Sequence, residues 1–336
     1  MKDVASEAGV ALGTVSKVVN GKPVGEEYEK KVREAIRKLN YHVNSYAQGL
    51  KASKTYTIVV ILPNTYTPFY GNLAFYLNKS LYSHGYRMLL CCSEFDSGRE
   101  QQYVEMAVQN KVDGIIGLTY NPDLQIPPEV PFISIDRSFD TGVPCVSSDN
   151  FIGGQMAAEK LADLGCTRVA FLRQGSGLKN EPNKRKAGFE NGCALRGLPY
   201  EIKMIGDGVP LTVFEDYLND HMHDGVLDFD GLFCVTDTLA YEVRRMLMKM
   251  GLTVPGDVQI IGYDGVRHFG NRGYTCSTIV QPVAQIADMC VDYLVQDQGR
   301  IRPQLSCLPV HYAAGGTTKD MDELEQNTWQ NEIDAL

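Results

Sequence analysis

From residue 57 onwards, short apolar runs alternate with amphipathic stretches along most of this 336-residue chain. The apolar runs have the length of buried strands and predict strands over residues 58–62, 88–92, 114–118, 132–135, 169–172, 232–235 and 259–262. Apolar residues at helical spacing predict helices between them, over residues 70–84, 101–109, 153–164, 187–195, 239–250 and 283–294. Repeated strand–helix units of this kind fold into parallel, doubly wound sheets, so the pattern predicts an α/β body.

Ligands bind such sheets beyond the carboxyl ends of the strands, which makes the residues after each expected strand candidates for a site. These residues combine carboxylates, hydroxyls, a guanidinium and aromatic rings; they are Asn64, Thr65, Thr67, Pro68, Phe69, Tyr70, Thr119, Tyr120, Asp136, Arg137, Thr236, Asp237 and Asp264. A sugar needs this mixture, because polar groups bind its hydroxyls and an aromatic face packs against its C–H side. For Asp136 and Arg137, a structural ion pair explains the residues as well as a ligand contact does.

The first forty residues follow a different pattern, which predicts three short helices over residues 2–8, 13–20 and 26–39. Gly9 and Gly21 end the first two, since glycine accepts the positive φ of a helix C-terminus. The third helix has one apolar face, made of Tyr28, Val32, Ile36 and Leu39. The second has valines on one side and, on the other, Leu12, Gly13, Ser16, Lys17 and Asn20.

Two helices joined by a tight turn, with one face to pack and one to present, meet the requirements of a DNA-binding helix-turn-helix. A small helical subdomain with a solvated face fits the same periodicity. The charge distribution favours contact with a polyanion: residues 1–55 carry ten basic and six acidic side chains, whereas the remainder carries 22 and 35.

Several other classes of protein are excluded. The longest clean apolar run, residues 58–62, is far shorter than the roughly 20 residues that cross a bilayer, and acids occupy the N-terminus where a signal peptide is apolar. The nine cysteines are odd in number and irregularly spaced, which favours reduced thiols over disulfides or a zinc module. No phosphate-binding glycine loop is present, so no nucleotide cofactor is expected, and His221 and His223 are expected at a solvated helix end rather than on a metal. These features predict a soluble cytoplasmic protein without a cofactor.

The sequence motifs of the N-terminal segment identify a protein family more specifically than its periodicity does. Asp3-Val4-Ala5, Ala8-Gly9-Val10 and residues 14–21 resemble the headpiece of the LacI/GalR (lactose repressor) family of transcriptional regulators, and residues 39–50 resemble its hinge. The resemblance implies that Leu12, Gly13 and Lys17 read bases, and that Thr14, Ser16 and Asn20 hold phosphates or neighbouring bases. Lys17 replaces the usual arginine and lacks its bidentate fork, and Gly13 has no side chain, so Leu12 and Lys17 must carry the specificity.

The hinge implied by the resemblance covers residues 44–53. A helix this short is marginal in water, so we expect it to fold only on DNA, against the hinge of a second copy. Its minor-groove residues would be Asn44, Tyr46, Ala47 and Leu50, with Leu50 as the wedge that kinks the site. Val43 and Gln48 depart from the residues that are usual in the family.

The resemblance continues through the body, in Ile135-Asp136-Arg137, Asp149-Asn150, Gly153-Gly154, Gly188-Phe189, Ile261-Gly262-Tyr263-Asp264 and Gln281-Pro282. It implies a headpiece (1–43), a hinge (44–53) and two periplasmic-binding-protein-like subdomains, one of residues 56–150 and 282–310, the other of 151–281 and 311–318. The chain would cross between them near 150, 281 and 311, and an acidic tail (319–336) would follow as a solvated extension. The implied effector residues are Asn64, Thr67, Phe69, Tyr120, Asp149, Arg185, Thr236 and Asp264, among which Thr236 replaces a longer asparagine.

These observations predict an effector-responsive DNA-binding regulator without catalytic activity, a repressor of carbohydrate genes that binds a palindromic double-stranded operator as a homodimer. The effector would be a sugar or sugar phosphate. A regulator with a nucleobase, amino-acid or phosphoprotein effector remains open. A sugar-binding protein of transport is disfavoured by the headpiece, and an enzyme built on the same core is disfavoured by the lack of a catalytic constellation.

Overall fold

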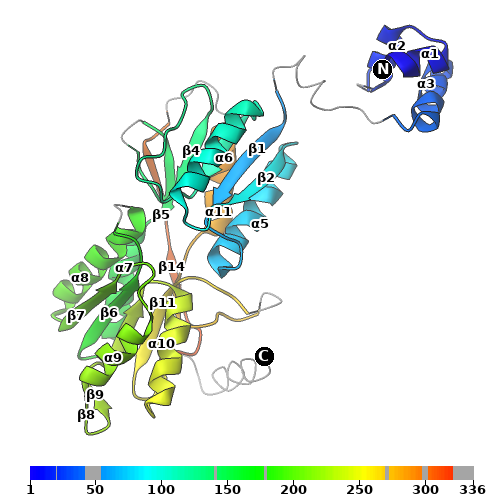
Figure 1. The fold of residues 1–336 in the computed structure, drawn as a ribbon. Helices are drawn as coiled ribbons and strands as arrows, with labels where there is room; N and C mark the ends of the chain where they lie inside the picture. The colour runs from blue at the N-terminus through cyan, green and yellow to red at the C-terminus, as the bar shows by residue number, and fades with distance from the viewer. Residues whose placement is uncertain are drawn as a thin grey trace. The chain divides into compact units, whose positions relative to one another are not determined.

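The computed structural model describes residues 1–19, 21–41, 54–139, 142–177, 180–268, 272–296 and 302–320. The chain forms two compact units, Met1–Tyr56 and Thr57–Leu336 (Figure 1). The hinge residues Asn44, Tyr46, Ala47 and Leu50 and the base-contact candidate Asn20 lie outside the described residues.

The first unit contains the three expected helices, α1 (Lys2–Ala8), α2 (Leu12–Val19) and α3 (Glu26–Lys38). Gly9 adopts the left-handed conformation that ends α1, with φ of 63°. A small core forms where the helices meet, from Val4, Val15, Val18, Val32 and Ala35. The apolar face expected for the third helix is only partly correct. Tyr28 and Leu39 are exposed, because α1 and α2 cover the middle of α3 and leave its ends in solvent.

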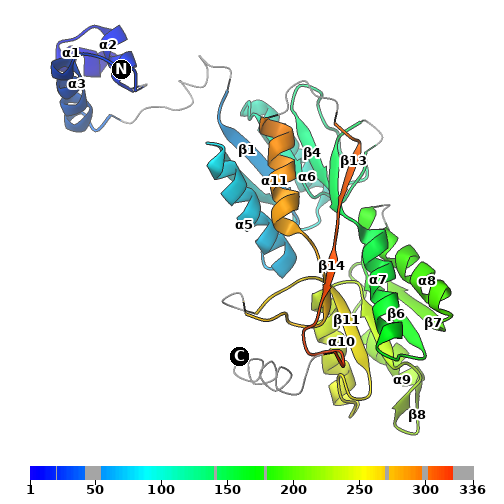
Figure 2. The same cartoon turned by 180° about the vertical axis from the view of Figure 1, so that it is seen from behind.

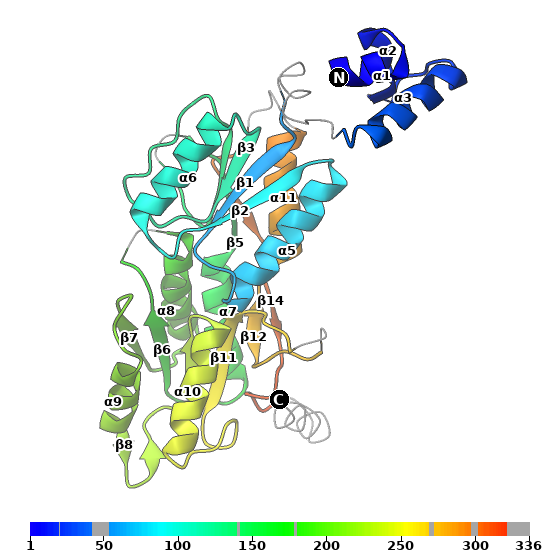
Figure 3. The same ribbon diagram turned by 45° about the vertical axis from the view of Figure 1, so that its right-hand side comes forward.

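The second unit contains two six-stranded sheets. The strands of the first are all parallel, in the order β13 (Leu305–Leu308), β5 (Cys145–Ser148), β4 (Phe132–Ile135), β3 (Gly114–Gly117), β1 (Thr57–Leu62) and β2 (Arg87–Cys92). Helices α5 (Pro68–Ser83) and α11 (Val283–Val295) cover one face of this sheet (Figure 2), and α6 (Ser97–Gln109) covers the other (Figure 3). A sheet buried on both faces needs continuous apolar strands, as in the Ile58–Leu62 run.

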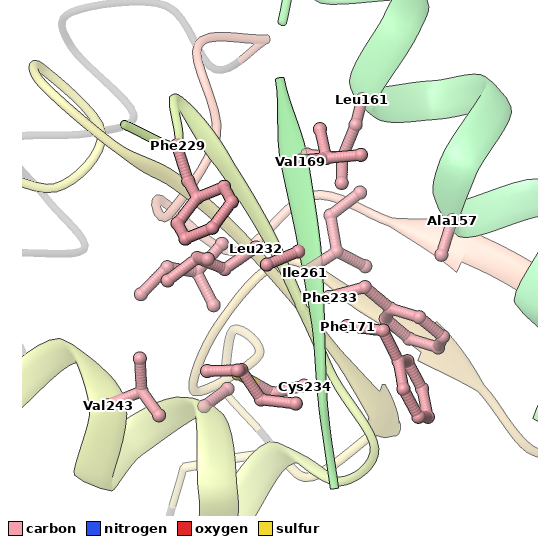
Figure 4. Close-up of a cluster of buried hydrophobic side chains, with 14 of the residues drawn as sticks. Ala157, Leu161, Val169, Phe171, Phe229, Leu232, Phe233, Cys234, Val243 and Ile261 are labelled. Carbon is pink, nitrogen blue, oxygen red and sulfur yellow. The ribbon is translucent and has the colours of Figure 1, made fainter. Parts of the chain in front are cut away.

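The second sheet has the order β14 (His311–Ala313), β12 (Thr278–Val280), β11 (Gln259–Asp264), β10 (Gly231–Cys234), β6 (Val169–Gln174) and β7 (Tyr200–Ile205). Only the pair β12/β14 is antiparallel. Its helices are α7 (Asn150–Asp163), α8 (Lys184–Arg196), α9 (Thr212–Asp220) and α10 (Asp237–Lys249), accompanied by the one-turn η1 (Glu181–Asn183) and the hairpin β8 (Met222–His223) with β9 (Val226–Leu227). Figure 4 shows its core, in which Leu161 of α7 and Val243 of α10 approach opposite faces of the strands.

The chain passes between the two sheets three times, between β5 and α7, between β12 and α11, and between β13 and β14. The α/β fold class with two doubly wound sheets is thus confirmed. Within the two sheets, the strands β5, β7, β12, β13 and β14 were absent from the predicted set, because they are short or lie at a sheet edge and carry no long apolar run. The hairpin strands β8 and β9 were also absent.

Five of the six expected body helices begin two to four residues before their expected starts, and α11 begins where it was expected. In α6, α7 and α10 a polar side chain caps the first turn. Asp96 accepts a hydrogen bond from the backbone N–H of Arg99, and Thr236 accepts one from that of Leu239. Periodicity detects the apolar face of a helix and misses its polar first turn. This error matters here, because several of these first turns border the site described below.

Other expectations concern residues at the periphery. All nine cysteines are free thiols and most are buried. His221 stands at the end of α9, as expected. It is half-buried, its ring against Phe229 and its Nε2 atom 3.3 Å from a Glu201 carboxylate oxygen, so the expected solvation is wrong for this residue. The expected tail also begins later: Asp320 forms an ion pair with Lys160 at 3.0 Å, and the residues after it lie outside the described part. Within that part, no helix combines the length and apolar character required to span a bilayer.

Candidate functional site

A cavity of about 680 Å³ lies at the carboxyl ends of strands from both sheets of the second unit. This is the position at which doubly wound sheets bind ligands. Most of the side chains that line it are polar, and the others in this set are aromatic; they include Asn64, Tyr66, Thr67, Phe69, Tyr70, Phe95, Tyr120, Asp136, Arg173, Gln174, Ser176, Asn180, Arg185, Asp207, Thr236, Thr238 and Asp264.

Arg185, in the first turn of α8, is held in place from several sides. Its Nε donates to Oδ1 of Asn150 at 2.7 Å, and one of its terminal nitrogens donates to the carbonyl oxygen of Val235 at 2.7 Å. The guanidinium lies over the Tyr263 ring, 3.6 Å from its centre, and 3.8 Å from a carboxylate oxygen of Asp264. A planar guanidinium fixed in this way keeps a defined orientation towards the cavity.

Asp264 ends β11 and is fixed as firmly. It has a φ of 123°, a backbone conformation that is strained for an aspartate, and its Oδ1 accepts a hydrogen bond from Gln281 at 2.7 Å. Gln281 in turn accepts one from Ser148 Oγ at 2.7 Å. Ser148 and Gln281 lie at the first and second passages between the sheets. The cavity carboxylate is therefore hydrogen-bonded directly into the connection between the two halves.

An aromatic wall belongs to the first sheet. The hydroxyls of Tyr70 and Tyr120 are 3.1 Å apart, and Phe95 meets the Tyr120 ring edge-on with 5.2 Å between the ring centres. The buried carboxylate of Glu100 accepts hydrogen bonds from the backbone N–H groups of Tyr120, at 2.9 Å, and Asn121, at 2.7 Å. This carboxylate fixes the loop after β3, so the wall is preformed.

Asp237 lies behind the cavity and is 2% exposed. It accepts hydrogen bonds from the N–H of Val266 at 2.7 Å and from the Cys276 thiol at 3.3 Å. Burial, and then the neighbouring Asp264 carboxylate, raise the pKa of Asp237 above its ordinary value. A carboxyl whose pKa is raised on folding binds more protons in the folded state, so its contribution to stability falls as the pH rises above about 4.

Replacing Asp237 with asparagine is therefore expected to flatten the decrease in stability between pH 5 and 8. Asp264, Cys276 and Cys234 are titratable groups that interact with this carboxyl, and they contribute to the residual slope together with the other buried carboxyls Asp136 and Glu100. The measurement is urea unfolding at several pH values, with the exposed Asp216→Asn as control. An unchanged slope in Asp237→Asn would contradict the prediction.

Seven of the eight effector residues implied by the sequence line this cavity: Asn64, Thr67, Phe69, Tyr120, Arg185, Thr236 and Asp264. Asp149 does not line it. Its carboxylate is occupied as the N-cap of α7, where it accepts a hydrogen bond from the N–H of Ile152 at 3.1 Å. The Thr236 oxygen similarly accepts the N–H of Leu239 at 3.2 Å, and its O–H remains available as a donor.

Asp136 and Arg137 have separate partners and form no ion pair with each other. Asp136 lines the cavity and accepts a hydrogen bond from Ser147 Oγ at 2.6 Å, whereas Arg137 donates to the carbonyl oxygens of Asn121 and Pro122. Of the two residues that follow β4, one therefore lines the cavity and the other binds a loop.

Sequence reasoning missed Arg173, Asn180 and Asp207. Arg173 stands directly after the predicted strand 169–172, so it meets the same criterion as the other candidates. Asn180 and Asp207 lie in loops whose approach to the cavity depends on the fold.

In the first unit, one face of α2 is exposed to solvent. Leu12 is 46% exposed, and Gly13 and Lys17 are exposed beside it, while Val15 and Val18 fill the core. Three of the five basic side chains of α3 form ion pairs: Lys31 with Glu27, Arg33 with Glu29, and Lys38 with Glu7. In the described part of the chain, no carboxylate oxygen lies within 4.0 Å of the Lys17 ammonium. Uncompensated positive charge is thus available on the face of α2.

Comparisons with known proteins agree with this division into two units. Residues 1–44 match the family described as bacterial regulatory proteins, lacI family, and residues 55–296 match periplasmic binding proteins and sugar binding domain of LacI family. The sucrose operon repressor of Streptococcus mutans is 32% identical over 94% of this chain and 98% of its own length. The ribose operon repressor of Escherichia coli is 31% identical over 88% of this chain and 92% of its own.

Solved structures share the fold. The Lac repressor bound to ONPG in the repressed state superposes with a TM-score of 0.78 at 23% identity, covering 94% of this chain and 98% of that one. A LacI family regulator from Enterococcus faecium with bound ribose superposes with a TM-score of 0.66 at 22% identity, covering 79% and 100%. The chain therefore belongs to the LacI family, as a DNA-binding repressor in which a small helical domain precedes a domain of the sugar-binding type.

Proposed function

We propose that this protein represses carbohydrate genes in response to a sugar that binds in the cavity between the two sheets. The observation that carries the proposal is the composition of the cavity wall. Arg185 and Asp264 offer fixed polar contacts from one sheet, and Phe69 and Tyr120 offer aromatic surface from the other. The related sucrose and ribose operon repressors support a sugar as the class of effector.

The same residues suggest how binding reaches the DNA. A ligand that contacts both sheets stabilises one angle between them, and Ser148 and Gln281 connect Asp264 to two of the passages that would bend. We propose that this change alters the spacing of two headpieces in a homodimer on a palindromic operator, in the cytoplasm where bacterial DNA lies. A coupling of about 1–3 kcal/mol would change operator affinity 5- to 150-fold.

A screen of ligands by thermal unfolding tests the proposal. Sucrose, ribose and other common sugars would be added to the purified full-length protein, with purines and amino acids as the opposing set. A sugar that raises the melting temperature and changes operator affinity supports the proposal, since a ligand stabilises the state that it binds. Stabilisation by a purine or an amino acid alone would reject it.

In the headpiece, we propose that Leu12, Gly13 and Lys17 face base edges and that Thr14 and Ser16 contact the backbone. Replacing Lys17 with alanine is expected to weaken operator binding about 10- to 100-fold and to relax the preference at one base pair, since a base contact contributes roughly 1–3 kcal/mol. The measurement is fluorescence anisotropy on a duplex selected from random palindromes.

Lys30→Ala is a matched control, because it removes the same charge from an exposed position on α3. It is expected to change affinity little and to leave sequence preference unaltered. If the two variants lost affinity equally and both kept their base preference, Lys17 would contribute charge alone and its assignment to base contact would be wrong. Lys17→Arg, which restores a bidentate fork, is expected to sharpen discrimination for guanine.

A further inference from the structure

We propose that the effector carries an anionic group, a phosphate or a carboxylate, and that Arg173 binds it. This inference deepens the proposed function and rests on it, since it concerns the same cavity. The observation behind it is a buried guanidinium at the cavity wall whose charge the surrounding protein leaves without an ion pair.

Arg173 stands near the carboxyl end of β6, and its neighbour in the sheet is Met204 of β7. The residue is 6% exposed and lines the cavity. One terminal nitrogen donates to the carbonyl oxygen of Ser176 at 3.1 Å. A Cβ placed on Gly175 would lie 3.3 Å from the Arg173 Nε, so the glycine leaves room for the guanidinium beside its own backbone.

No carboxylate oxygen in the described residues lies within 4.0 Å of the Arg173 guanidinium. This sets it apart from Arg185, which has Asp264 at 3.8 Å, an amide oxygen and a ring face. Asp207, whose charge acts favourably on Arg173, is an exposed side chain of the loop after β7. Burial, and then the like charge of Arg185, lower the pKa of Arg173.

A buried charge without a counter-ion is costly, and proteins rarely keep one unless a ligand supplies the opposite charge. A phosphate or carboxylate suits the planar, five-donor geometry of arginine better than a neutral hydroxyl does. A neutral sugar could accept one or two hydrogen bonds from this group but would leave its charge uncompensated.

The arrangement also gives the ligand an orientation. Arg173 and the nearby Ser176 and Asn180 belong to the second sheet and its loops, whereas Phe69 and Tyr120 belong to the first. The anionic end would bind Arg173, and the sugar ring would pack against the aromatic wall. Arg173 then acts as a specificity-determining residue, which selects charged sugars over their neutral counterparts.

The first test uses inorganic phosphate as the probe. Thermal unfolding of the full-length protein would be followed in phosphate and in chloride at equal ionic strength. Phosphate is expected to raise the melting temperature, and in Arg173→Gln its apparent Kd is expected to rise at least tenfold. Without phosphate, Arg173→Gln is expected to be at least as stable as the wild type, because the substitution removes an uncompensated buried charge. Arg272→Gln, at an exposed arginine, is the matched control and is expected to keep the wild-type response.

A wild type that responds equally to phosphate and chloride, or an Arg173→Gln variant that keeps the phosphate response, would overturn the proposal. A second arm identifies the source of the anion by comparing glucose, glucose 6-phosphate and glucuronate, and ribose with ribose 5-phosphate. Stabilisation by a sugar phosphate would identify the anionic group bound by Arg173 as a phosphate. Stabilisation by glucuronate would identify it as a carboxylate. Stabilisation by neutral sugars alone overturns the anionic subsite while leaving the proposed sugar-responsive function intact.

Discussion

Replacing Gly188 with alanine is expected to destabilise the protein by about 3 kcal/mol or more, at the upper end of the usual range for overpacked sites. Helix propensity alone predicts the opposite sign, since alanine is favoured over glycine inside a helix by roughly 1 kcal/mol. The tertiary structure reverses the sign because Gly188 lies where α8 contacts α7 through its backbone.

The geometry at this contact leaves no space for a side chain. A Cβ on Gly188 would overlap the carbonyl oxygen of Phe151, and one on Gly154 would overlap that of Arg185. One turn further along α8, a Cβ on Gly192 would lie 2.7 Å from the carbonyl oxygen of Gln155. These atoms belong to helix backbones, which cannot rotate away as a flexible side chain can. The helices would have to separate, and Arg185 would move with α8.

Urea unfolding of Gly188→Ala and Gly206→Ala measures the effect. Gly206 is the control, because a Cβ there would meet only Val209 Cγ2, at 3.9 Å. The control is expected to stay within about 0.5 kcal/mol of the wild type, as substitutions at uncrowded surface sites do. Equal stability of the two variants would show that α7 and α8 can separate at little cost.

Replacing Arg185 with methionine is expected to abolish the response to the effector and to lower stability. Hydrogen bonds from a charged donor contribute roughly 1.5–3 kcal/mol each, so effector affinity should fall about 100-fold or more. Removal of the guanidinium also leaves the Asp264 carboxylate and the Asn150 and Val235 oxygens without this donor. Breaking a buried pair in this way costs roughly 3–5 kcal/mol.

The loss of response can be separated from the loss of stability by operator binding. Below its melting temperature, Arg185→Met is expected to bind operator through the intact headpiece. Its operator affinity is expected to stay the same when the sugar identified by the thermal screen is added. Arg245→Gln is the control: this arginine lies on the exposed face of α10 and pairs with Glu242 at 3.1 Å. A variant Arg185→Met that still responded to the sugar would remove Arg185 from the effector site.

The amino-acid sequence was sufficient for the elements with long apolar patterns. Strands such as β1 were predicted from a continuous apolar run, and helices such as α10 from apolar residues at helical spacing. Eight of the thirteen residues suspected after these strands line the cavity, since the carboxyl ends of parallel strands meet at one edge of a sheet; Thr65, Pro68, Thr119, Arg137 and Asp237 do not line it. The family followed from the motifs in residues 1–50 and was confirmed by the comparisons.

Other features depended on contacts between residues far apart in the chain. The sequence could not show that the Asp149 carboxylate is occupied by the start of α7, nor that Asp207 approaches the cavity from a loop. It could not distinguish Arg185, which is surrounded by partners, from Arg173, which forms no ion pair within 4.0 Å in the described residues. A sequence period reports which face of an element is buried. The charge balance inside a cavity depends on which loops meet there, and that is decided only when the two sheets are assembled.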